Sequence, residues 1–145
     1  MKAKIKKLDP TVELPKYHTP ESAAFDLASS EDYTVEPGDI VKIKTGLVIE
    51  APQDHFLLIA SRSSLPLKKG LALANGIGVV DRDYAGPNDE ILILVRNFTD
   101  TEVVVSKGER IAQGIFVKID QVEWEEADMI RQTDRGGYGS TGGYN

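Results

Sequence analysis

A guanidinium and three hydroxyl groups stand side by side in the segment Ser61-Arg62-Ser63-Ser64-Leu65. The segment directly follows the apolar run Phe56–Ala60, so it is expected where a β-strand ends. Groups of this kind donate charge-assisted hydrogen bonds to phosphate oxygens. The same residues also suit a polar turn that caps a short helix, with Arg62 in a surface ion pair. The segment by itself leaves both interpretations open.

A carboxylate follows a short apolar stretch in Asn75-Gly76-Ile77-Gly78-Val79-Val80-Asp81. The two glycines permit close approach of the backbone to a ligand, as in a β-hairpin lined by main-chain groups. Directly after two valines, Asp81 is expected to be dry enough to orient or deprotonate a water molecule. The alternative is a turn in which Asp81 and Asp83 accept hydrogen bonds from nearby backbone N–H groups.

A third polar segment, Gly108-Glu109-Arg110-Ile111-Ala112-Gln113, joins a turn to an apolar strand. Arg110 or Gln113 can contact a phosphate from this position. Because alternate residues of a strand face opposite sides, the two residues fit equally well as a structural salt bridge and a surface amide.

Short β-strands are expected to position these segments. The predicted strands are Ile40–Thr45, Leu47–Ile49, Phe56–Ala60, Ile91–Val95, Val103–Val105 and Ile115–Ile119. Glu36-Pro37-Gly38-Asp39 suits a type II turn, and Ser106-Lys107-Gly108-Glu109 is a second turn. The pattern predicts an all-β sandwich or barrel, with one helical turn at most within Ser63–Lys69. Val122–Arg131 is acidic and only weakly periodic.

The composition limits what this chain can be. With 145 residues, 41% of them hydrophobic, it is expected to form one domain with a core of ordinary size. It has no cysteine, so disulfides, cysteine-ligated zinc and thiolate catalysis are excluded. A formal charge of −6 has the wrong sign for neutralising a nucleic-acid backbone, but a few cations can still bind a small polyanion.

No secretory signal or membrane span is expected from the sequence. Met1–Lys7 is basic, but Leu8–Leu14 contains Asp9, Pro10 and Glu13 where a signal needs an apolar run. No run approaches the roughly 18 apolar residues of a membrane span. We therefore predict a soluble, cytoplasmic protein.

The composition changes from Thr133 to Asn145, where Gly, Ser, Thr and Tyr dominate and no aliphatic residue occurs. Such a tail cannot pack a core of its own, and composition alone predicts a disordered terminus. Arg135, Tyr138 and the pair Ser140-Thr141 indicate the alternative of a clasp around a ring and phosphates.

Taken together, five segments resemble, in order, the motifs of the trimeric dUTP diphosphatase (dUTPase) family. They are Ala23-Ala24-Phe25-Asp26-Leu27, Arg62-Ser63-Ser64-Leu65, Gly78-Val79-Val80-Asp81 with Asp83-Tyr84 and Gly86, Gly108-Glu109-Arg110-Ile111-Ala112-Gln113, and Gly139-Ser140-Thr141-Gly142. The resemblance extends over almost the whole chain. It implies an all-β fold, a jelly-roll-like β-barrel or β-clip over residues 1–132, followed by a flexible, Gly-rich lid over residues 133–145. It also implies a homotrimer whose subunits share active sites.

The resemblance implies hydrolysis of dUTP to dUMP and pyrophosphate, which keeps uracil out of DNA and supplies dUMP for dTMP synthesis. Asp81 matches the catalytic carboxylate that activates a water for attack on the α-phosphorus. The expected cofactor is Mg²⁺, held mainly by the substrate phosphates and water without a direct protein ligand. The expected partner is the small molecule dUTP, with no nucleic acid and no membrane.

Other matched residues are expected to bind the substrate. Those for the phosphates are Arg62, Ser63, Ser64 and Gln113, and those for uracil are Asn75 and the backbone of Gly78, Val79 and Val80. Tyr84 is expected under the deoxyribose, where its ring crowds a ribose 2′-hydroxyl. In the tail, Tyr138 matches the aromatic that stacks on uracil, Arg135 the cation for the terminal phosphate, and Gly139, Ser140 and Thr141 further substrate contacts. Asp26 is expected only to support the site.

Three features depart from the family pattern. Pro87-Asn88-Asp89 is an apparent insertion that lengthens a hairpin beside the site. Only two glycines separate Arg135 from Tyr138, so Arg135 can reach a different phosphate oxygen, or Arg131 can share its task. Tyr138 replaces the usual phenylalanine, but stacking needs only the flat ring.

Two other functions stay open at this stage. A dCTP deaminase has the same fold, but the position of its catalytic glutamate, counted back from Asn97, matches Leu94, which cannot transfer a proton. A non-catalytic nucleotide-binding regulatory module can use the same scaffold, because fold does not determine function. The presence of Asp81 argues against the second alternative.

Overall fold

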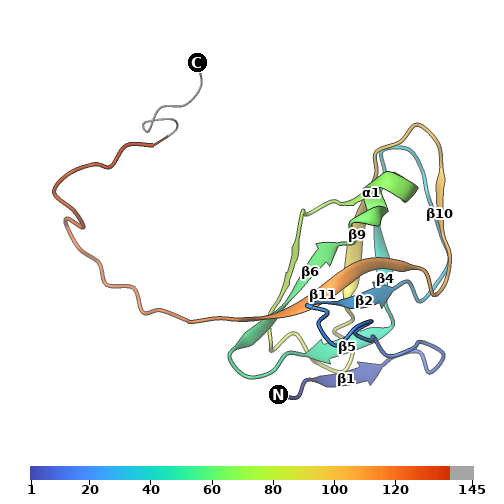
Figure 1. The fold of residues 1–145 in the computed structure, drawn as a ribbon, viewed down its shortest axis with the longest axis horizontal. Helices are drawn as coiled ribbons and strands as arrows, with labels where there is room; N and C mark the ends of the chain where they lie inside the picture. The colour runs from blue at the N-terminus through green and yellow to red at the C-terminus, as the bar shows by residue number, and fades with distance from the viewer. Residues whose placement is uncertain (138–145) are drawn as a thin grey trace.

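The structure of the chain is a computed structural model that describes residues 1–137 (Figure 1). Its regular elements in these residues are strands and one short helix. The strands are β1 (Lys4–Lys7), β2 (Phe25–Ala28), β3 (Tyr33–Val35), β4 (Ile40–Lys44), β5 (Leu47–Glu50), β6 (His55–Ser61), β7 (Leu71–Leu73), β8 (Gly78–Val80), β9 (Leu92–Asn97), β10 (Val103–Val105) and β11 (Arg110–Lys118), and the helix is α1 (Ser64–Lys69). The predicted all-β class is confirmed.

Every pairing between these strands is antiparallel, and β11 is the longest strand. A four-stranded sheet has the order β2-β11-β6-β8, and a three-stranded sheet has the order β4-β9-β7. Two further pairs are β1 with β5 and β10 with β3. Buried side chains from both larger sheets form one hydrophobic cluster, so a single core holds the strands together.

Alternation of buried and exposed side chains explains why the predicted strands form. In β6, Leu57 and Ile59 are buried while their neighbours are half-buried, and in β9, Ile93 and Val95 enter the core. This period of two matches the pleat of a strand with one face on the core. The predicted strand Ile115–Ile119 begins earlier than expected, because the first half of β11 also pairs with β2 and β6.

Both predicted turns have the expected geometry. Gly38 has a φ of 81°, and the N–H of Asp39 donates to the carbonyl of Glu36 at 3.1 Å. Gly108 also has a φ of 81°, in a turn closed by the N–H of Glu109 on the carbonyl of Ser106 at 2.9 Å. These left-handed conformations favour glycine, so the predicted type II turn and the second turn are confirmed.

The helix α1 is short because its end is fixed. It stops at Gly70, whose φ of 65° is left-handed and whose N–H donates to the carbonyl of Pro66 at 3.2 Å. A Cβ at Gly70 would lie 2.1 Å from Cγ2 of Thr99. Only glycine therefore fits, and the predicted helical turn within Ser63–Lys69 is confirmed.

After β11 the chain leaves the body of the protein as an extended arm, residues 119–137, drawn in orange and red in Figure 1. The arm has no helix or strand in its described residues, and its apolar side chains are exposed, Trp124 by 92% and Ile130 by 90%. No helix among residues 1–137 is long and apolar enough to cross a membrane.

Asn97, at the end of β9, is fully buried and links β9 to β3 and to the loop at Thr101. Its amide nitrogen donates to the carbonyls of Val35 and Thr101 at 2.9 and 2.7 Å. Its amide oxygen accepts from the backbone N–H and the hydroxyl of Thr99 at 2.9 and 2.7 Å. Every polar atom of this side chain is therefore paired inside the core.

Replacing Asn97 with alanine is expected to lower the free energy of unfolding by roughly 2 to 4 kcal/mol, because buried carbonyls lose their donor. Urea denaturation followed by fluorescence measures the change. The matched control is Asn88→Ala at an exposed position, which should change stability by less than about 0.5 kcal/mol. Equal effects from the two variants would contradict the role of Asn97.

Candidate functional site

Two guanidinium groups share one carboxylate where β2, β6 and β11 meet. Asp26 lies in β2, Arg110 begins β11, and Arg62 directly follows β6. Oδ1 of Asp26 lies 3.0 Å from Nε of Arg62, and Oδ2 lies 3.1 Å from Nη1 of Arg110. Nη1 of Arg62 also donates to the carbonyl of Arg110 at 3.0 Å. We call Asp26, Arg62, Arg110 and the neighbouring His18 the cation cluster.

A β-bulge gives Arg110 its place in the cation cluster. The pairing of β11 with β2 shifts register between Arg110 and Ala112, leaving Ile111 as the extra residue. Without the shift, Arg110 would face the core together with buried Ala112 and Gly114. With it, Arg110 lies on the same side as Asp26 and Gln113, which are cross-strand partners. The interpretation that Arg110 and Gln113 face opposite sides is therefore wrong.

The cation cluster can attract an anion. The carboxylate of Asp26 is only 14% exposed, whereas the side chains of Arg62 and Arg110 are 28% and 48% exposed. One negative charge between two positive groups leaves a net positive charge at the surface. The exposed guanidinium N–H groups are suited to the oxygens of a phosphate, in bidentate geometry.

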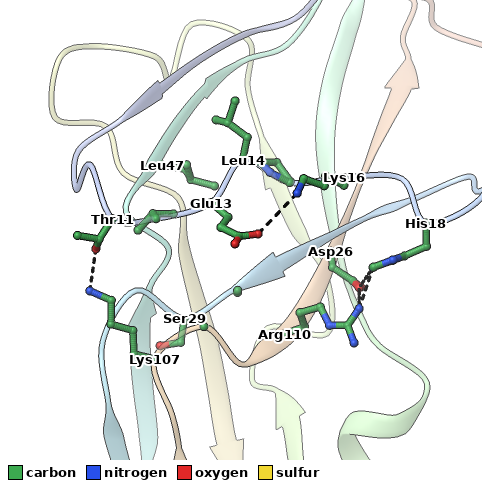
Figure 2. Close-up of a pocket in the computed structure, with 14 residues that line it drawn as sticks. Thr11, Glu13, Leu14, Lys16, His18, Asp26, Ser29, Leu47, Lys107 and Arg110 are labelled. Carbon is green, nitrogen blue, oxygen red and sulfur yellow. Dashed lines mark hydrogen bonds and ion pairs between the residues drawn. The ribbon is translucent and has the colours of Figure 1, made fainter.

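His18 is a member of the cation cluster that sequence reasoning missed. Its Nε2 lies 2.8 Å from Oδ2 of Asp26 and 2.8 Å from Nη1 of Arg110 (Figure 2). No spacing in the sequence identifies it, because the contact depends on the loop before β2 folding back over the strand.

The other predicted phosphate residues lie close to Arg62. Ser63 is the exposed residue before α1 and makes no side-chain capping bond, and Ser64 begins the helix. Gln113 donates from Nε2 to the carbonyl of Ser61 at 3.0 Å. Gln113 therefore fixes the end of β6 from which Arg62 extends.

A cavity of about 560 Å³ opens beside the cation cluster, under the segment that leads into β2 (Figure 2). Lys16, Lys107, His18 and Arg110 line it together with Asp26. Lys107 is held by the hydroxyl of Thr11, at 2.9 Å from Nζ. Side-chain and backbone hydrogen bonds from Thr11 lower the pKa of Asp9 to about 2, so Asp9 stays ionised beside Lys107. Among residues 1–137, those predicted for catalysis or uracil binding do not line this cavity.

The second group of predicted residues lies on and after β8. Asn75, Val79, Asp81 and Tyr84 are all exposed, and the carboxylate of Asp81 makes no hydrogen bond to any residue of the described range 1–137. Two expectations are therefore wrong for a single chain, the dry environment of Asp81 and its bonding to nearby backbone N–H groups. The cause is that β8 lies at the edge of its sheet, where no other strand of residues 1–137 pairs with its outer side.

The expected hairpin around Gly76 and Gly78 is also not formed. The flanking strands pair with different neighbours, β7 with β9 and β8 with β6. The turn between them therefore carries the chain from one sheet to the other. As a result, no strand within residues 1–137 pairs with the outer backbone edge of Gly78–Val80.

The apparent insertion Pro87-Asn88-Asp89 forms a closed turn that is fixed to β1. The N–H of Gly86 donates to Oδ2 of Asp89 at 2.7 Å, and Nζ of Lys6 donates to the carbonyl of Pro87 at 2.8 Å. The insertion therefore holds the loop that follows Asp81 instead of loosening it.

The start of the same loop is held by an ion pair network. Glu50 lies between Lys4, at 2.7 Å, and Arg82, at 3.0 Å. The hydrogen bond from Lys4, with the nearby charges of Lys4 and Arg82, lowers the pKa of Glu50. Arg82 directly follows Asp81, so this network fixes the backbone that carries the predicted catalytic carboxylate.

Within one chain, the cation cluster and Asp81 lie at opposite ends of β6. Asp81 follows Val80, which pairs with Leu57 near the start of β6, whereas Arg62 follows Ser61 at its end. Six residues of strand correspond to roughly 20 Å. This separation exceeds what side chains of one chain can bridge around a single phosphate.

The tail contributes little to the described geometry. Arg131 and Arg135 are exposed at the end of the arm. Tyr138, Gly139, Ser140 and Thr141 lie outside the described residues.

Comparison with known proteins shows what this chain is related to. The family model described as dUTPase matches residues 11–142, which contain all five motif segments. The chain belongs to the dUTPase family. The deoxyuridine 5′-triphosphate nucleotidohydrolase of Desulfitobacterium hafniense is 47% identical over 139 residues, 92% of this chain and 90% of that protein. The protein of the same name from Hydrogenobaculum sp. is 41% identical to this chain, over 98% of this chain and 99% of that protein.

Solved dUTPase structures have the same fold. The dUTPase from Streptococcus mutans has a TM-score of 0.76 at 35% identity, over 83% of this chain and 98% of that one. The Staphylococcus bacteriophage 80alpha dUTPase with dUPNHPP has a TM-score of 0.84 at 24% identity, over 97% and 98%, which supports the fold alone. The predicted jelly-roll-like β fold and the predicted hydrolase of the dUTPase family are confirmed, and these findings do not favour a dCTP deaminase.

Proposed function

We propose that this dUTPase-family chain hydrolyses dUTP to dUMP and pyrophosphate. The observation that carries the proposal is the family match over residues 11–142, which includes every motif with a predicted role. In this proposal the enzyme works in the cytoplasm, keeps uracil out of DNA and supplies dUMP for dTMP synthesis.

The cation cluster supports binding of the triphosphate. Arg62 and Arg110 are held at fixed positions by Asp26 and still expose N–H groups. The hydroxyls of Ser63 and Ser64 lie beside Arg62 and add neutral donors. Asp26 acts as a positioning residue, because it touches the two guanidinium groups instead of the substrate.

Asp81 is proposed as the general base. Its carboxylate orients a water molecule and accepts its proton while the oxygen attacks the α-phosphorus, and pyrophosphate leaves. Mg²⁺, which is expected to arrive with the substrate, would neutralise part of the charge of the triphosphate. No group of three or more His, Asp or Glu in residues 1–137 is arranged as metal ligands. That Mg²⁺ has no direct protein ligand stays a prediction.

Uracil and deoxyribose are proposed to bind along β8. As the edge strand of its sheet, β8 has backbone N–H and C=O groups that no strand in residues 1–137 uses. Gly78, Val79 and Val80 can therefore read the hydrogen-bonding edge of a base, with Asn75 beside them. Tyr84 is 43% exposed and presents its ring to the sugar, where a 2′-hydroxyl would collide with it.

A shared active site in a homotrimer is the arrangement that joins these two groups. Arg62 and Asp81 are too far apart within one chain, and Asp81 lacks cover until another copy lies over it. The extended arm exposes Trp124 and Ile130 almost fully, which is costly unless they pack on a neighbour. The arm would then carry Arg135 and the tail residues Tyr138, Gly139, Ser140 and Thr141 to a neighbouring site as a lid.

The first test is release of pyrophosphate from dUTP in Mg²⁺, measured beside dCTP, dTTP and UTP. Hydrolysis of dUTP alone is expected, because the edge of β8 selects the base and Tyr84 selects the sugar. Binding of dUTP without turnover would support the regulatory module instead. Release of ammonia from dCTP would support deamination.

Replacing Asp81 with asparagine should keep dUTP binding and lower the turnover rate by roughly 10²- to 10⁴-fold, because the amide cannot accept the proton of the water. Calorimetry measures binding, and pyrophosphate release measures turnover. Asp100→Asn changes another exposed acid, outside the five motif segments, and should leave both values unchanged. A normal rate for Asp81→Asn would remove this residue from its role.

Mixed assemblies test whether the site is shared. Asp81→Asn and Arg62→Gln are each expected to be nearly inactive alone. If the two residues come from different subunits of a trimer, about a quarter of the sites in a co-expressed equal mixture contain both intact residues. Activity should therefore return on mixing. A mixture as inactive as the single variants would show that both residues act from one chain.

A further inference from the structure

His18 occupies a position that the proposed mechanism does not use. Its Nε2 is 2.8 Å from a carboxylate oxygen of Asp26 and 2.8 Å from a guanidinium nitrogen of Arg110 (Figure 2). The first neighbour only accepts hydrogen bonds when ionised, and the second only donates them. A single ring nitrogen therefore faces two partners with opposite requirements.

One proton on Nε2 decides which partner is satisfied. With the proton present, Nε2 donates to Asp26, and the N–H groups of Arg110 face another donor. With the proton absent, Nε2 accepts from Arg110, and the oxygen of Asp26 faces a lone pair. The imidazole cannot satisfy both neighbours in either state.

The position of His18 is set by contacts on both sides of it. Tyr17 packs edge-on against Phe25, with ring centroids 5.7 Å apart. Thr19 and Ser22 close a turn through three hydrogen bonds, including the N–H of Thr19 on the hydroxyl of Ser22 at 3.0 Å. The ring is therefore held over the cation cluster, while 57% of the side chain stays exposed to exchange protons with water.

The charged groups around His18 come from several elements. They are Asp26 on β2, Arg110 on β11, Arg62 after β6, Lys107 in the turn before β11, and Glu13 and Lys16 on the segment that carries His18. Glu13 and Lys16 pair with each other at 3.7 Å, and Lys107 pairs with Asp9 at 3.3 Å. Within the described residues, the groups in direct contact with Nε2 are Asp26 and Arg110.

We propose that His18 is a positioning residue for the triphosphate, that its neutral ring carries the proton on Nδ1 and accepts from Arg110 at Nε2, and that protonation of Nε2 releases Arg110 so that it can bind a phosphate oxygen. The proposal rests on the proposed function, because it assigns Arg110 to the phosphates of that substrate. Protonation also adds one positive charge to the cation cluster. Both effects favour anion binding, and by linkage a bound anion favours the protonated ring.

The sign of the pH dependence follows from this coupling. When the ring is protonated, His18 donates to Asp26 and Arg110 is available to the anion. When the ring is neutral, it accepts from Arg110 and holds it. The KM for dUTP should therefore rise with pH, whereas kcat should be nearly unaffected by this group.

The test compares wild type with His18→Gln and His18→Lys over roughly pH 5.5 to 8.0. The triphosphate also titrates in this range, but equally for every variant. Over this pH range, the KM of wild type is expected to rise about 5-fold more than the KM of His18→Gln. A factor of this size corresponds to a modest coupling free energy between the protonation site and the anion site. His18→Lys carries a permanent charge that pairs with Asp26, so its KM should stay low at pH 8. Thermal unfolding of each variant checks that the fold is intact.

His55→Gln is the matched control, because His55 is the other histidine of the chain and lies at the opposite end of β6 from Arg62. Nδ1 of His55 contacts the carbonyl of Gln53 at 2.7 Å. This variant should keep the wild-type dependence of KM on pH.

A second readout does not need turnover. Calorimetry of pyrophosphate binding in two buffers with different ionisation enthalpies measures proton uptake, which should be larger for wild type than for His18→Gln. Normal dUTP turnover with the same pH dependence of KM in wild type and His18→Gln would overturn the role of His18 and leave the proposed function intact. Absence of dUTP turnover in wild type would overturn the proposed function. Equal proton uptake by wild type and His18→Gln would then also overturn the role of His18.

Discussion

The simultaneous pairing of β11 with β2 and β6 is the constraint on which the cation cluster, the proposed phosphate-binding part of this protein, depends. It brings Asp26, Arg62 and Arg110 together, although they are far apart in the sequence. Close packing at Gly114 makes the pairing possible, because a Cβ there would lie 2.6 Å from the ring of Phe25. A larger residue would push β2 away from β11, and the carboxylate that holds both arginines would move with it.

Charge and exposure divide the molecule into two incomplete halves of a site. The end of β6 near Arg62 carries positive groups fixed by one partly buried carboxylate. The other end, at β8, carries an uncovered carboxylate and an open backbone edge. Within residues 1–137, neither half has the low dielectric that strengthens electrostatic catalysis, because Arg110 and Asp81 are both open to solvent. In the proposed trimer, a neighbouring copy would supply the other half and exclude water in the same step, which would account for motifs that are scattered along the sequence.

The loop after Asp81 shows how the surrounding structure makes up for a departure from the family pattern. The residues of the apparent insertion could have loosened this loop, but the carboxylate of Asp89 closes a turn and Lys6 anchors its backbone. Glu50 fixes the start of the loop through Arg82. The first strand therefore contributes to the site without any motif residue, since its side chains hold both ends of the loop that carries Asp81 and Tyr84.

The sequence by itself determined the β class, the two glycine turns, most strands of the core and the family, because these depend on local residue preferences and on motifs in order. It also identified Arg62, Asp81 and Gln113 as candidates from residue type and motif. Only the tertiary structure decided which of them meet. The bulge at Ile111 reverses the side on which Arg110 lies, and a regular alternation cannot reveal an extra residue. The edge position of β8 leaves Asp81 exposed, and the folding of the loop before β2 brings His18 to Asp26. These three outcomes depend on which strands pair and in what register, and that is determined by contacts between residues distant in the chain.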